Sequence, residues 1–217
     1  MKKSKVFTIA ALSLCLVGTA GCSSMTNMGK GALIGGGKGA GIGAAIGAAV
    51  GAGAGTLIGR KMDQQKKQLE EELAQKAQVE TVTDQNGLQA IKVTFNSGIL
   101  FPTNGTTLNT SERQTLSGFA SNLISNPETN VQIFGYTDNT GTMAVNERVA
   151  NGRADAVRTF LVNSGVSGSR ITAEGIPMAD YVASNETAEG RAQNRRVEIY
   201  ITANKQMIQQ AENGTLQ

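Results

Sequence analysis

A glycine stands at every fourth position from Gly31 to Gly59 without interruption, and mostly Ala, Ile, Leu and Val fill the gaps. Four residues advance an α-helix by slightly more than one turn, so these glycines would form one gently spiralling stripe. A stripe without side chains lets a second helix approach closely. Each glycine disfavours a helix in water by about 0.8–1 kcal/mol relative to alanine, so such a helix needs a packed partner or a membrane.

We therefore predict a glycine-zipper segment over residues 31–60, a pattern that resembles segments of some envelope proteins. Residues 39–59 carry no charge and would span about 30 Å as a helix. Pairing of two such helices would make the chain a homo-oligomer. A membrane-spanning helix, a helical hairpin and a flexible Gly/Ala linker all remain compatible with this stretch.

The first 21 residues have the pattern of an export signal. Lysines within residues 2–5 precede an apolar run over residues 6–17, and small residues at 19–21 provide a cleavage site. Cys22 follows directly. This pattern resembles a bacterial lipoprotein signal, although Thr19 stands where that family prefers Leu. We expect a signal peptide over residues 1–21, lipidation of Cys22 and a lipidated tether over residues 22–30; an ordinary secretory leader is the alternative.

Composition excludes several classes of function. Without the three leader lysines, basic and acidic groups balance, so we predict no pull on nucleic acid. The chain has no His, and its two Cys lie in the leader and at the lipidation position. Zinc sites with His ligands and Ser/His or Cys nucleophiles are therefore excluded. We predict no cofactor, no metal and no enzyme activity; paired carboxylates like those of glycosidases fit the composition, but no pair is set apart.

A charged stretch follows the glycine repeat. Lys, Gln and Glu dominate residues 61–78, and Met62, Leu69 and Leu73 leave only a thin apolar stripe. We predict a solvated, charged helical linker there, since a coiled coil needs more apolar positions. The polar tail over residues 204–217 is predicted to fray.

Strand and helix patterns alternate over residues 79–203, which predicts a two-layer α/β domain, that is, an α+β fold. Two β-rich runs flank Asn86-Gly87 and predict a hairpin. Helical spacing follows over residues 109–125 and 143–164, and the second helix has Val145, Val157 and Leu161 on its apolar face. Gly165 fits a helix C-cap. Further strands are predicted at residues 131–136, 170–174 and 196–202, with a short helical turn at 188–193.

Several spaced motifs in this domain resemble the OmpA-like peptidoglycan-binding domain over roughly residues 88–202. They are Gly135-Tyr136-Thr137-Asp138…Gly141, Asn146…Arg153-Ala154…Val157, Gly165-Val166…Arg170-Ile171 and Asn194-Arg195-Arg196-Val197-Glu198. The resemblance implies a βαβαββ domain with helices on one side of a mixed sheet. It also implies binding to diaminopimelate in the stem peptide of the cell wall. With the leader and zipper in front, the whole chain resembles the YiaD-type outer-membrane lipoproteins, which implies a cell outer membrane location with the domain in the periplasm.

The residue chemistry fits such a ligand, because the free end of diaminopimelate carries an ammonium and a carboxylate on one carbon. Asp138 would accept from the ammonium, and the forked guanidinium of Arg153 would hold the carboxylate. Positions matching Asn146 and Arg195 also line the site in the family. Asn146 and Arg153 lie seven residues apart, so they share one helix face.

Three further residues complete the candidate site as secondary contacts: Thr137, Asn139 and Asn104. Many family members carry Asp in the loop before the first helix, where this chain has Pro102 with Asn104 nearby. Each site residue also has a structural alternative. Asp138 could serve solely as the cap of the helix that follows it, and Arg153 could pair locally with a carboxylate. Arg195 could support the sheet structurally, and we expect this structural role of Arg196.

The favoured function is therefore a non-catalytic tether between the outer membrane and peptidoglycan. A membrane-inserting oligomer, built by the glycine zipper and merely anchored by the domain, is the first alternative. A peptidoglycan-acting enzyme is the second, less favoured one.

Overall fold

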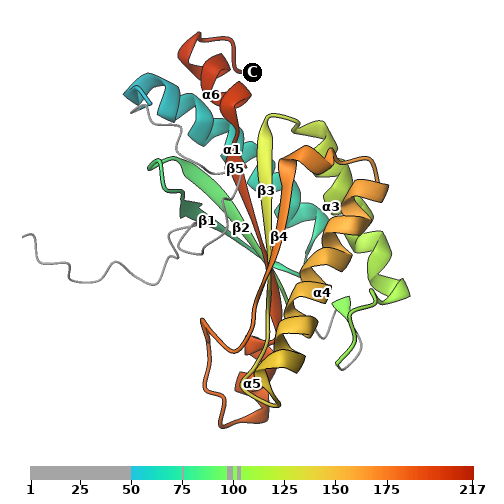
Figure 1. Ribbon diagram of the computed structural model, residues 1–217. Helices are drawn as coiled ribbons and strands as arrows, with labels where there is room; N and C mark the ends of the chain where they lie inside the picture. Colours follow the sequence, from blue (N-terminus) through green and yellow to red (C-terminus); the bar gives the residue numbers. More distant parts are fainter. Residues whose placement is uncertain (1–49, 75, 97–99, 102–103) are drawn as a thin grey trace, which may run out of the picture. The chain divides into compact units, whose positions relative to one another are not determined.

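The computed structural model describes residues 50–217, apart from residues 75, 97–99 and 102–103 (Figure 1). The expected signal peptide, Cys22, the tether and the glycine repeat up to residue 49 lie outside the described residues, as does Pro102. The last two glycines of the repeat, Gly55 and Gly59, lie in the first described helix, α1 (Ala52–Glu72).

A five-stranded mixed sheet forms the centre of the described domain. Its strands stand in the order β1-β2-β5-β3-β4. β3 and β4 are parallel, and all other neighbours are antiparallel. The bounds are β1 (Gln78–Thr83), β2 (Gln89–Asn96), β3 (Thr129–Tyr136), β4 (Ile171–Ile176) and β5 (Arg196–Ala203).

The predicted hairpin at Asn86-Gly87 is confirmed, since β1 and β2 pair antiparallel around it. Gly87 has a φ of 75°, a conformation that costs glycine little. The Asp84 carboxylate accepts hydrogen bonds from the backbone N–H groups of Asn86 and Leu88, at 2.8 and 2.9 Å. Local turn chemistry therefore fixes the turn of this hairpin.

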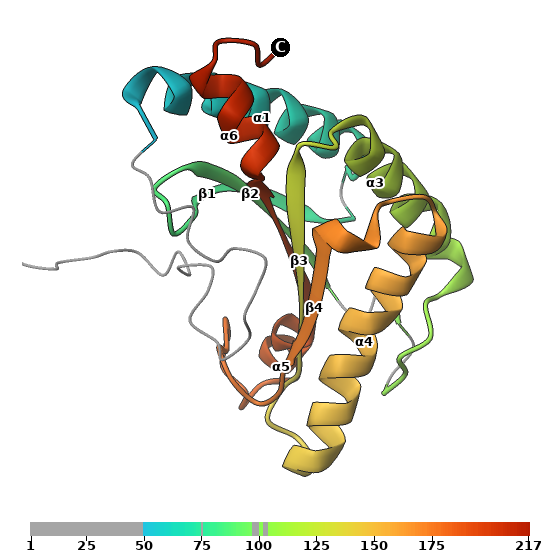
Figure 2. The same ribbon diagram turned by 45° about the horizontal axis from the view of Figure 1, so that its top comes forward.

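Four α-helices cover one face of the sheet and share a single core with it (Figures 1 and 2). They are α1, α3 (Arg113–Ser125), α4 (Met143–Asn163) and α6 (Lys205–Glu212). A short helix, α5 (Ala188–Asn194), stands between β4 and β5, and two 3-10 turns, η1 (Thr110–Glu112) and η2 (Gly168–Arg170), complete the chain order. The predicted two-layer α+β fold is thus confirmed. From β2 onward the order is βαβαβ, then α5 and the last strand.

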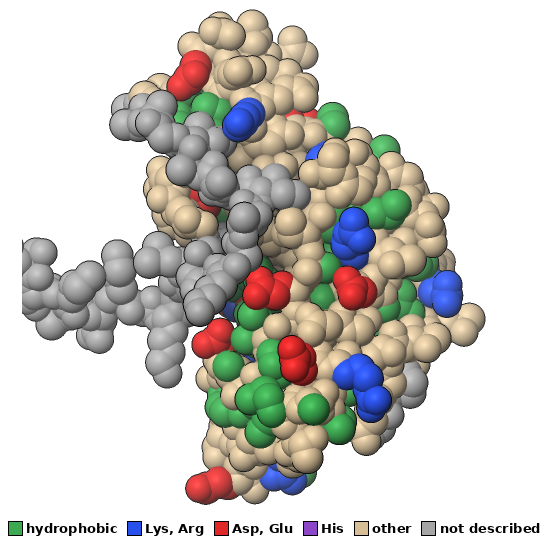
Figure 3. All heavy atoms as spheres, viewed as in Figure 1, with side chains coloured by type: hydrophobic (Ala, Val, Ile, Leu, Met, Phe, Trp, Pro, Cys, Tyr) green, Lys and Arg blue, Asp and Glu red, His purple; other side chains and the backbone are tan. Residues whose placement is uncertain are grey.

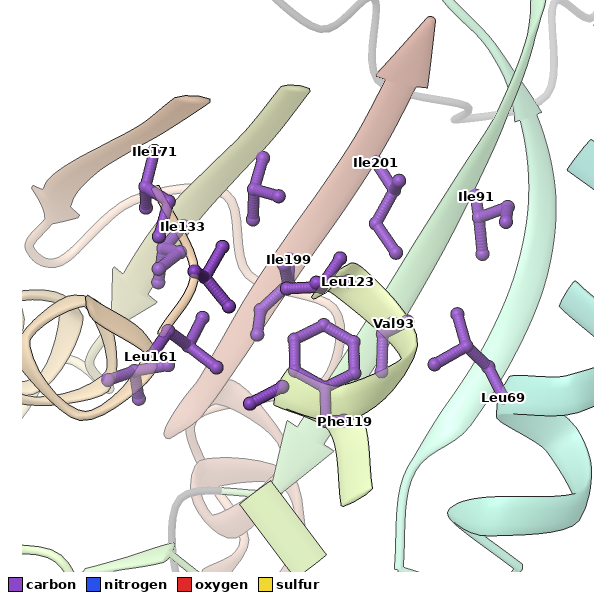
Figure 4. Close-up of a cluster of buried hydrophobic side chains, with 14 of the residues drawn as sticks. Leu69, Ile91, Val93, Phe119, Leu123, Ile133, Leu161, Ile171, Ile199 and Ile201 are labelled. Carbon is purple, nitrogen blue, oxygen red and sulfur yellow. The ribbon is translucent and has the colours of Figure 1, made fainter. Parts of the chain in front are cut away.

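Alternating side chains of the strands meet the apolar stripes of these helices in the core. Figure 4 shows Leu69 of α1, Phe119 and Leu123 of α3 and Leu161 of α4 facing Ile91, Val93, Ile133, Ile171, Ile199 and Ile201 of the sheet. Phe95 and Phe119 add an edge-to-face ring contact with centroids 6.1 Å apart. The described residues include no Cys, so no disulfide bond joins them and side-chain packing holds this core together.

Two glycines bring α4 into backbone contact with the sheet. Gly135 of β3 and Gly175 of β4 stand opposite each other in the parallel register. A methyl group on Gly135 would collide with the carbonyl oxygen of Ala150, and one on Gly175 with the N–H of Asn151. Because Ala150 lies one turn from Asn146 and from Arg153, this close approach sets both side chains at the carboxyl end of β3.

The structure corrects the interpretation of residues 61–78 as a solvated spacer. α1 covers most of this stretch, and its side chains Ile58, Met62 and Leu69, together with the C-cap Leu73, are at most 1% exposed in the common core. Gln65 lies on the same buried stripe and donates to the side chain of Asn122 on α3 at 3.0 Å. The stripe is thin but continuous, so α1 is part of the domain.

The C-terminal stretch also differs from the predicted frayed tail. Residues 205–212 form α6, which buries Met207, Ile208 and Ala211 in the core and packs beside α1. Asn204 begins this helix, since its side chain accepts from the N–H of Met207 at 3.0 Å. The domain thus extends past residue 203.

The buried face of α4 is shifted from the predicted one. Val145 is 47% exposed, whereas Val157 and Leu161 are buried as expected. Asn146 and Arg153 take the buried stripe instead. The helix ends as predicted: Gly165 has a φ of 103°, and its N–H reaches the carbonyl of Val162 at 3.0 Å. None of the described helices is long and apolar enough to cross a membrane.

Candidate functional site

The candidate residues gather at the end of the sheet where β3 finishes and β5 starts. β3 and β5 are antiparallel neighbours, with Gly135 opposite Val197. The loop after β3 and the residue before β5 therefore lie side by side, which brings Asp138 next to Arg195. α4 begins beyond the same loop, so Asn146 and Arg153 approach from the helix layer. The N-terminal end of α4, α5 and the β4–α5 loop lie at this end in both views (Figures 1 and 2).

Asp138 is 3% exposed and makes a dense set of hydrogen bonds. Its Oδ1 accepts from the backbone N–H of Thr140 at 2.9 Å and from the Thr140 hydroxyl. Its Oδ2 forms an ion pair with Nη1 of Arg195 at 2.5 Å. The helix cap is Thr142, whose hydroxyl accepts from Val145. Asp138 is thus a turn and ion-pair residue, and the alternative that it caps α4 is wrong.

The charge state of Asp138 follows from these contacts. Burial alone would raise the pKa of Asp138, but the hydrogen bonds from Thr140 and the ion pair with Arg195 outweigh it and lower the pKa. Because the folded-state pKa lies below the unfolded one, about 3.9, the carboxylate stabilises the fold at pH values above that unfolded pKa. This stabilisation is lost as the pH falls through the folded-state pKa.

We expect Thr140→Val to raise the pKa of Asp138, because the variant loses the hydroxyl donor and keeps only the backbone N–H. The acid limb of stability should then move to higher pH. A ¹³C NMR titration of the Asp138 carboxyl measures this directly. Thr142→Val is the matched control. It also removes a hydroxyl from this loop, but that hydroxyl accepts from the N–H of Val145 and does not contact Asp138. An unchanged pKa in Thr140→Val would show that the hydroxyl bond contributes nothing.

Asn146 holds the loop rather than pointing a free amide group at a ligand. Its Nδ2 donates to the carbonyls of Thr140 at 2.7 Å and of Thr142 at 3.0 Å, and the side chain is 6% exposed. These bonds fix the loop that carries Asp138. The structure thus places Asn146 next to Asp138 as a residue that positions the loop, and its predicted contact with a ligand stays a prediction.

Arg153 is a buried cation, only 3% exposed. Its Nε donates to the carbonyl of Gly105 at 3.1 Å, and its guanidinium lies 5.5 Å from the ring centre of Phe101. Burial and the positive charge of Arg195 lower the pKa of Arg153, and Asp138 partly offsets them. The geometry therefore brings Asp138, Arg153 and Arg195 into mutual electrostatic reach, with two guanidinium groups around one carboxylate.

The three secondary candidate residues differ in their burial and contacts. Thr137 is buried, and its hydroxyl accepts from the N–H of Met178 at 3.0 Å, so it ties the site loop to the β4–α5 loop. Asn139 is exposed. Asn104 is exposed and has a φ of 56°, next to the Gly105 that Arg153 contacts. Cys22 lies outside the described residues.

Arg196, the first residue of β5, lies on the face opposite to that of the core residues Val197 and Ile199, and it has the structural role we expected. It is 4% exposed, donates to Glu198 at 2.7 Å and to the carbonyl of Asp180 at 2.9 Å, and lies 3.8 Å from the ring centre of Tyr136. Burial would raise the pKa of Glu198, but Arg196 and Lys92 outweigh it and lower the pKa. This cluster fixes the chain around Arg195.

Sequence reasoning missed Thr140, Gly105 and Phe101. The signal for Thr140 was available, since an Asp with a polar residue two positions on often forms a side-chain turn. Nothing local pointed to Gly105 or Phe101, because Arg153 reaches them across 48 residues or more. Among the described residues, no three His, Cys, Asp or Glu side chains gather in a way that could hold a metal ion.

Comparisons with known proteins agree with the fold and the motifs. Residues 100–195 match the OmpA family, and residues 29–66 match the glycine zipper family. The chain is 43% identical over 106 residues to "Probable lipoprotein YiaD" of Escherichia coli (strain K12), a match covering 49% of this chain and 48% of that protein. It is 39% identical over 112 residues to "Peptidoglycan-binding protein ArfA" of Mycobacterium tuberculosis (strain ATCC 25618 / H37Rv), covering 52% of this chain and 34% of that protein.

A solved structure matches more of the chain. It is the cell wall anchor of the T6SS from Pseudomonas aeruginosa, with a TM-score of 0.55 and 30% identity, and the match covers 63% of this chain and 97% of that one. The matches to the two curated relatives span about half or less of their length. The predicted OmpA-like resemblance, the fold and the glycine zipper are confirmed by these matches.

Proposed function

Because residues 100–195 form an OmpA-family domain, we propose that this protein binds peptidoglycan without catalysis, through diaminopimelate in the stem peptide. The observation that carries this proposal is the burial of Arg153 within electrostatic reach of Arg195 and of the Asp138 carboxylate that pairs with Arg195. Two guanidinium groups and one carboxylate leave one positive charge in excess, and a buried cation gains most from a ligand anion. A ligand carboxylate supplies that anion.

The ammonium of the same ligand goes to Asp138. A carboxylate offers about four acceptor positions, and three are used by Thr140 and Arg195. Oδ2 thus keeps a position for one ammonium N–H. A carboxylate on Arg153 and an ammonium on Asp138 match the two groups on one carbon at the free end of diaminopimelate. The names of the relatives, a peptidoglycan-binding protein and a cell wall anchor, support binding over catalysis.

Competition for insoluble peptidoglycan tests the ligand. We expect the protein to sediment with peptidoglycan, and free diaminopimelate to release it. A stem peptide with lysine in place of diaminopimelate is the matched competitor, because its α-groups are in peptide bonds and its side-chain ammonium has no carboxylate on the same carbon. Diaminopimelate amidated on both carboxyl groups should also compete poorly. If the lysine peptide releases the protein as well as the diaminopimelate peptide does, the role of Arg153 is wrong; soluble wall fragments in the supernatant would instead indicate an enzyme.

The tether has a second end, which we propose to be the lipidated Cys22 in the outer membrane. The support is the leader pattern together with the likeness to a lipoprotein over half of the chain. The domain would then lie in the periplasm. Metabolic labelling with palmitate tests this anchor: Cys22→Ser should lose the label, and retained label would exclude Cys22 as the site.

A further inference from the structure

The β4–α5 loop, residues 177–187, presents two apolar side chains to solvent. Tyr181 is 39% exposed and Val182 is 56% exposed. Figure 3 shows hydrophobic side chains gathered over this loop in the lower part of the view. Adjacent exposed Tyr and Val side chains in a loop that is otherwise mostly polar call for an explanation.

The loop is held firmly, so this exposure is built into the fold. The side chain of Asn194, which is fully buried, accepts from the N–H groups of Val182 and Ala183 and donates to the carbonyl of Ala183, all within 3.0 Å. Arg196 holds the carbonyl of Asp180 at 2.9 Å. Asp180 itself has a φ of 50°, an uncommon backbone conformation for a residue with a side chain.

The anchors of this loop are the immediate neighbours of the proposed clamp. Met178 is tied to Thr137, which precedes Asp138. Asn194 precedes Arg195, which pairs with Asp138. A ligand held by Asp138 and Arg153 would therefore lie beside the anchors of a rigid loop that carries Tyr181 and Val182.

We propose that Tyr181 and Val182 form a platform for a sugar ring of the glycan strand. This inference rests on the proposed function, because the stem peptide that enters the clamp is covalently joined to that strand. One face of a pyranose ring is made of C–H groups and packs on an aromatic ring, while the Tyr hydroxyl can bond a sugar hydroxyl. Two side chains are far too small for a stable protein interface, which buries about 800 Å² on each partner, but they match one sugar ring.

The test compares two soluble ligands by titration calorimetry on the full chain in detergent. One is a stem peptide that contains diaminopimelate, and the other is the same peptide still joined to its disaccharide. We expect the disaccharide form to bind about five- to tenfold more tightly. Tyr181→Ala should remove this preference and leave the affinity for the free peptide unchanged. Tyr181→Phe, which keeps the ring, should retain most of it, and Val182→Ser should lose part.

Ile124→Ala is the matched control, since Ile124 is 46% exposed on α3, outside the loop; it should not alter the preference. Thermal unfolding of each variant checks that the fold is intact. Equal binding of both ligands by the unaltered protein would overturn the sugar platform and leave the clamp in place. Failure of both ligands to bind would instead overturn the proposed function and this inference with it. A preference that survives Tyr181→Ala and Val182→Ser would also overturn the platform.

Discussion

Replacement of Arg153 by methionine is expected to abolish sedimentation with peptidoglycan, with affinity for a soluble stem peptide falling at least about 100-fold. Arg153 is 3% exposed and its guanidinium is flanked by Arg195 and Asp138, so a ligand carboxylate meets it in a largely dry site. Hydrogen bonds to charged groups contribute about 1.5–3 kcal/mol each, and a guanidinium makes two to a carboxylate. Titration calorimetry with the soluble peptide measures the loss.

Methionine is chosen because it fills the space beside Phe101 without leaving a cavity. The variant loses the hydrogen bond from Nε to the Gly105 carbonyl and the contact with Phe101, so its melting temperature should fall somewhat while unfolding stays cooperative. Arg153→Lys keeps the charge but loses the fork, so it should bind weakly. Arg158→Met, at an exposed position on the same helix, controls for the loss of a charge. Normal binding by Arg153→Met would show that Arg153 is structural, like Arg196.

Much of the fold and the polar residues of the site could be predicted from the chain alone. Turn chemistry at Asn86-Gly87 and the helix end at Gly165 are local signals, and both were confirmed. The order of strands and helices followed from the change between two-residue and helical spacing. Asp138 and Arg195 lie 57 residues apart, so their contact could be expected only through the family resemblance.

The misses on α4 and α1 share one physical cause: polar side chains on a buried face hide that face from a pattern search. On α4, Asn146 and Arg153 occupy the stripe that an apolar pattern should fill, which shifted the predicted face toward Val145. On α1, the polar side chain of Gln65 lies within the buried stripe, where it bonds Asn122 of α3 across 57 positions. The buried polar residues of α4 belong to the proposed site, whereas Gln65 of α1 fixes how this helix packs against α3.

Removal of residues 1–73 is expected to unfold the domain, even though the fragment retains every described strand and every candidate ligand-binding residue. The fragment loses Ile58, Met62, Leu69 and Leu73, each at most 1% exposed. Truncating one such side chain to alanine costs about 2–5 kcal/mol, and whole domains are stable by about 5–15 kcal/mol. Loss of all four therefore exceeds what the remaining core can offset. Circular dichroism during thermal unfolding measures the outcome.

The same helix sets the reach of the proposed tether. If residues 61–78 were a solvated helical linker, as predicted, the stretch from Cys22 to residue 78 would separate the lipid anchor from the domain. With α1 in the core, only the stretch from Cys22 to residue 50 is left, which spans at most about 100 Å when fully extended. The distance between a lipid anchor and the wall must then fall within that limit.

A chain that starts at residue 50 is the control for the truncation, because it keeps α1 and should unfold cooperatively like the full chain. Leu69→Ala in that chain should lower its stability by about 2–5 kcal/mol, and Lys67→Ala, at an exposed position of the same helix, should change it by less than about 0.5 kcal/mol. Cooperative unfolding of residues 74–217 at an unchanged temperature would contradict the role of α1. In that case the four buried side chains would pack on a domain that does not need them, and the spacer interpretation of residues 61–78 would return.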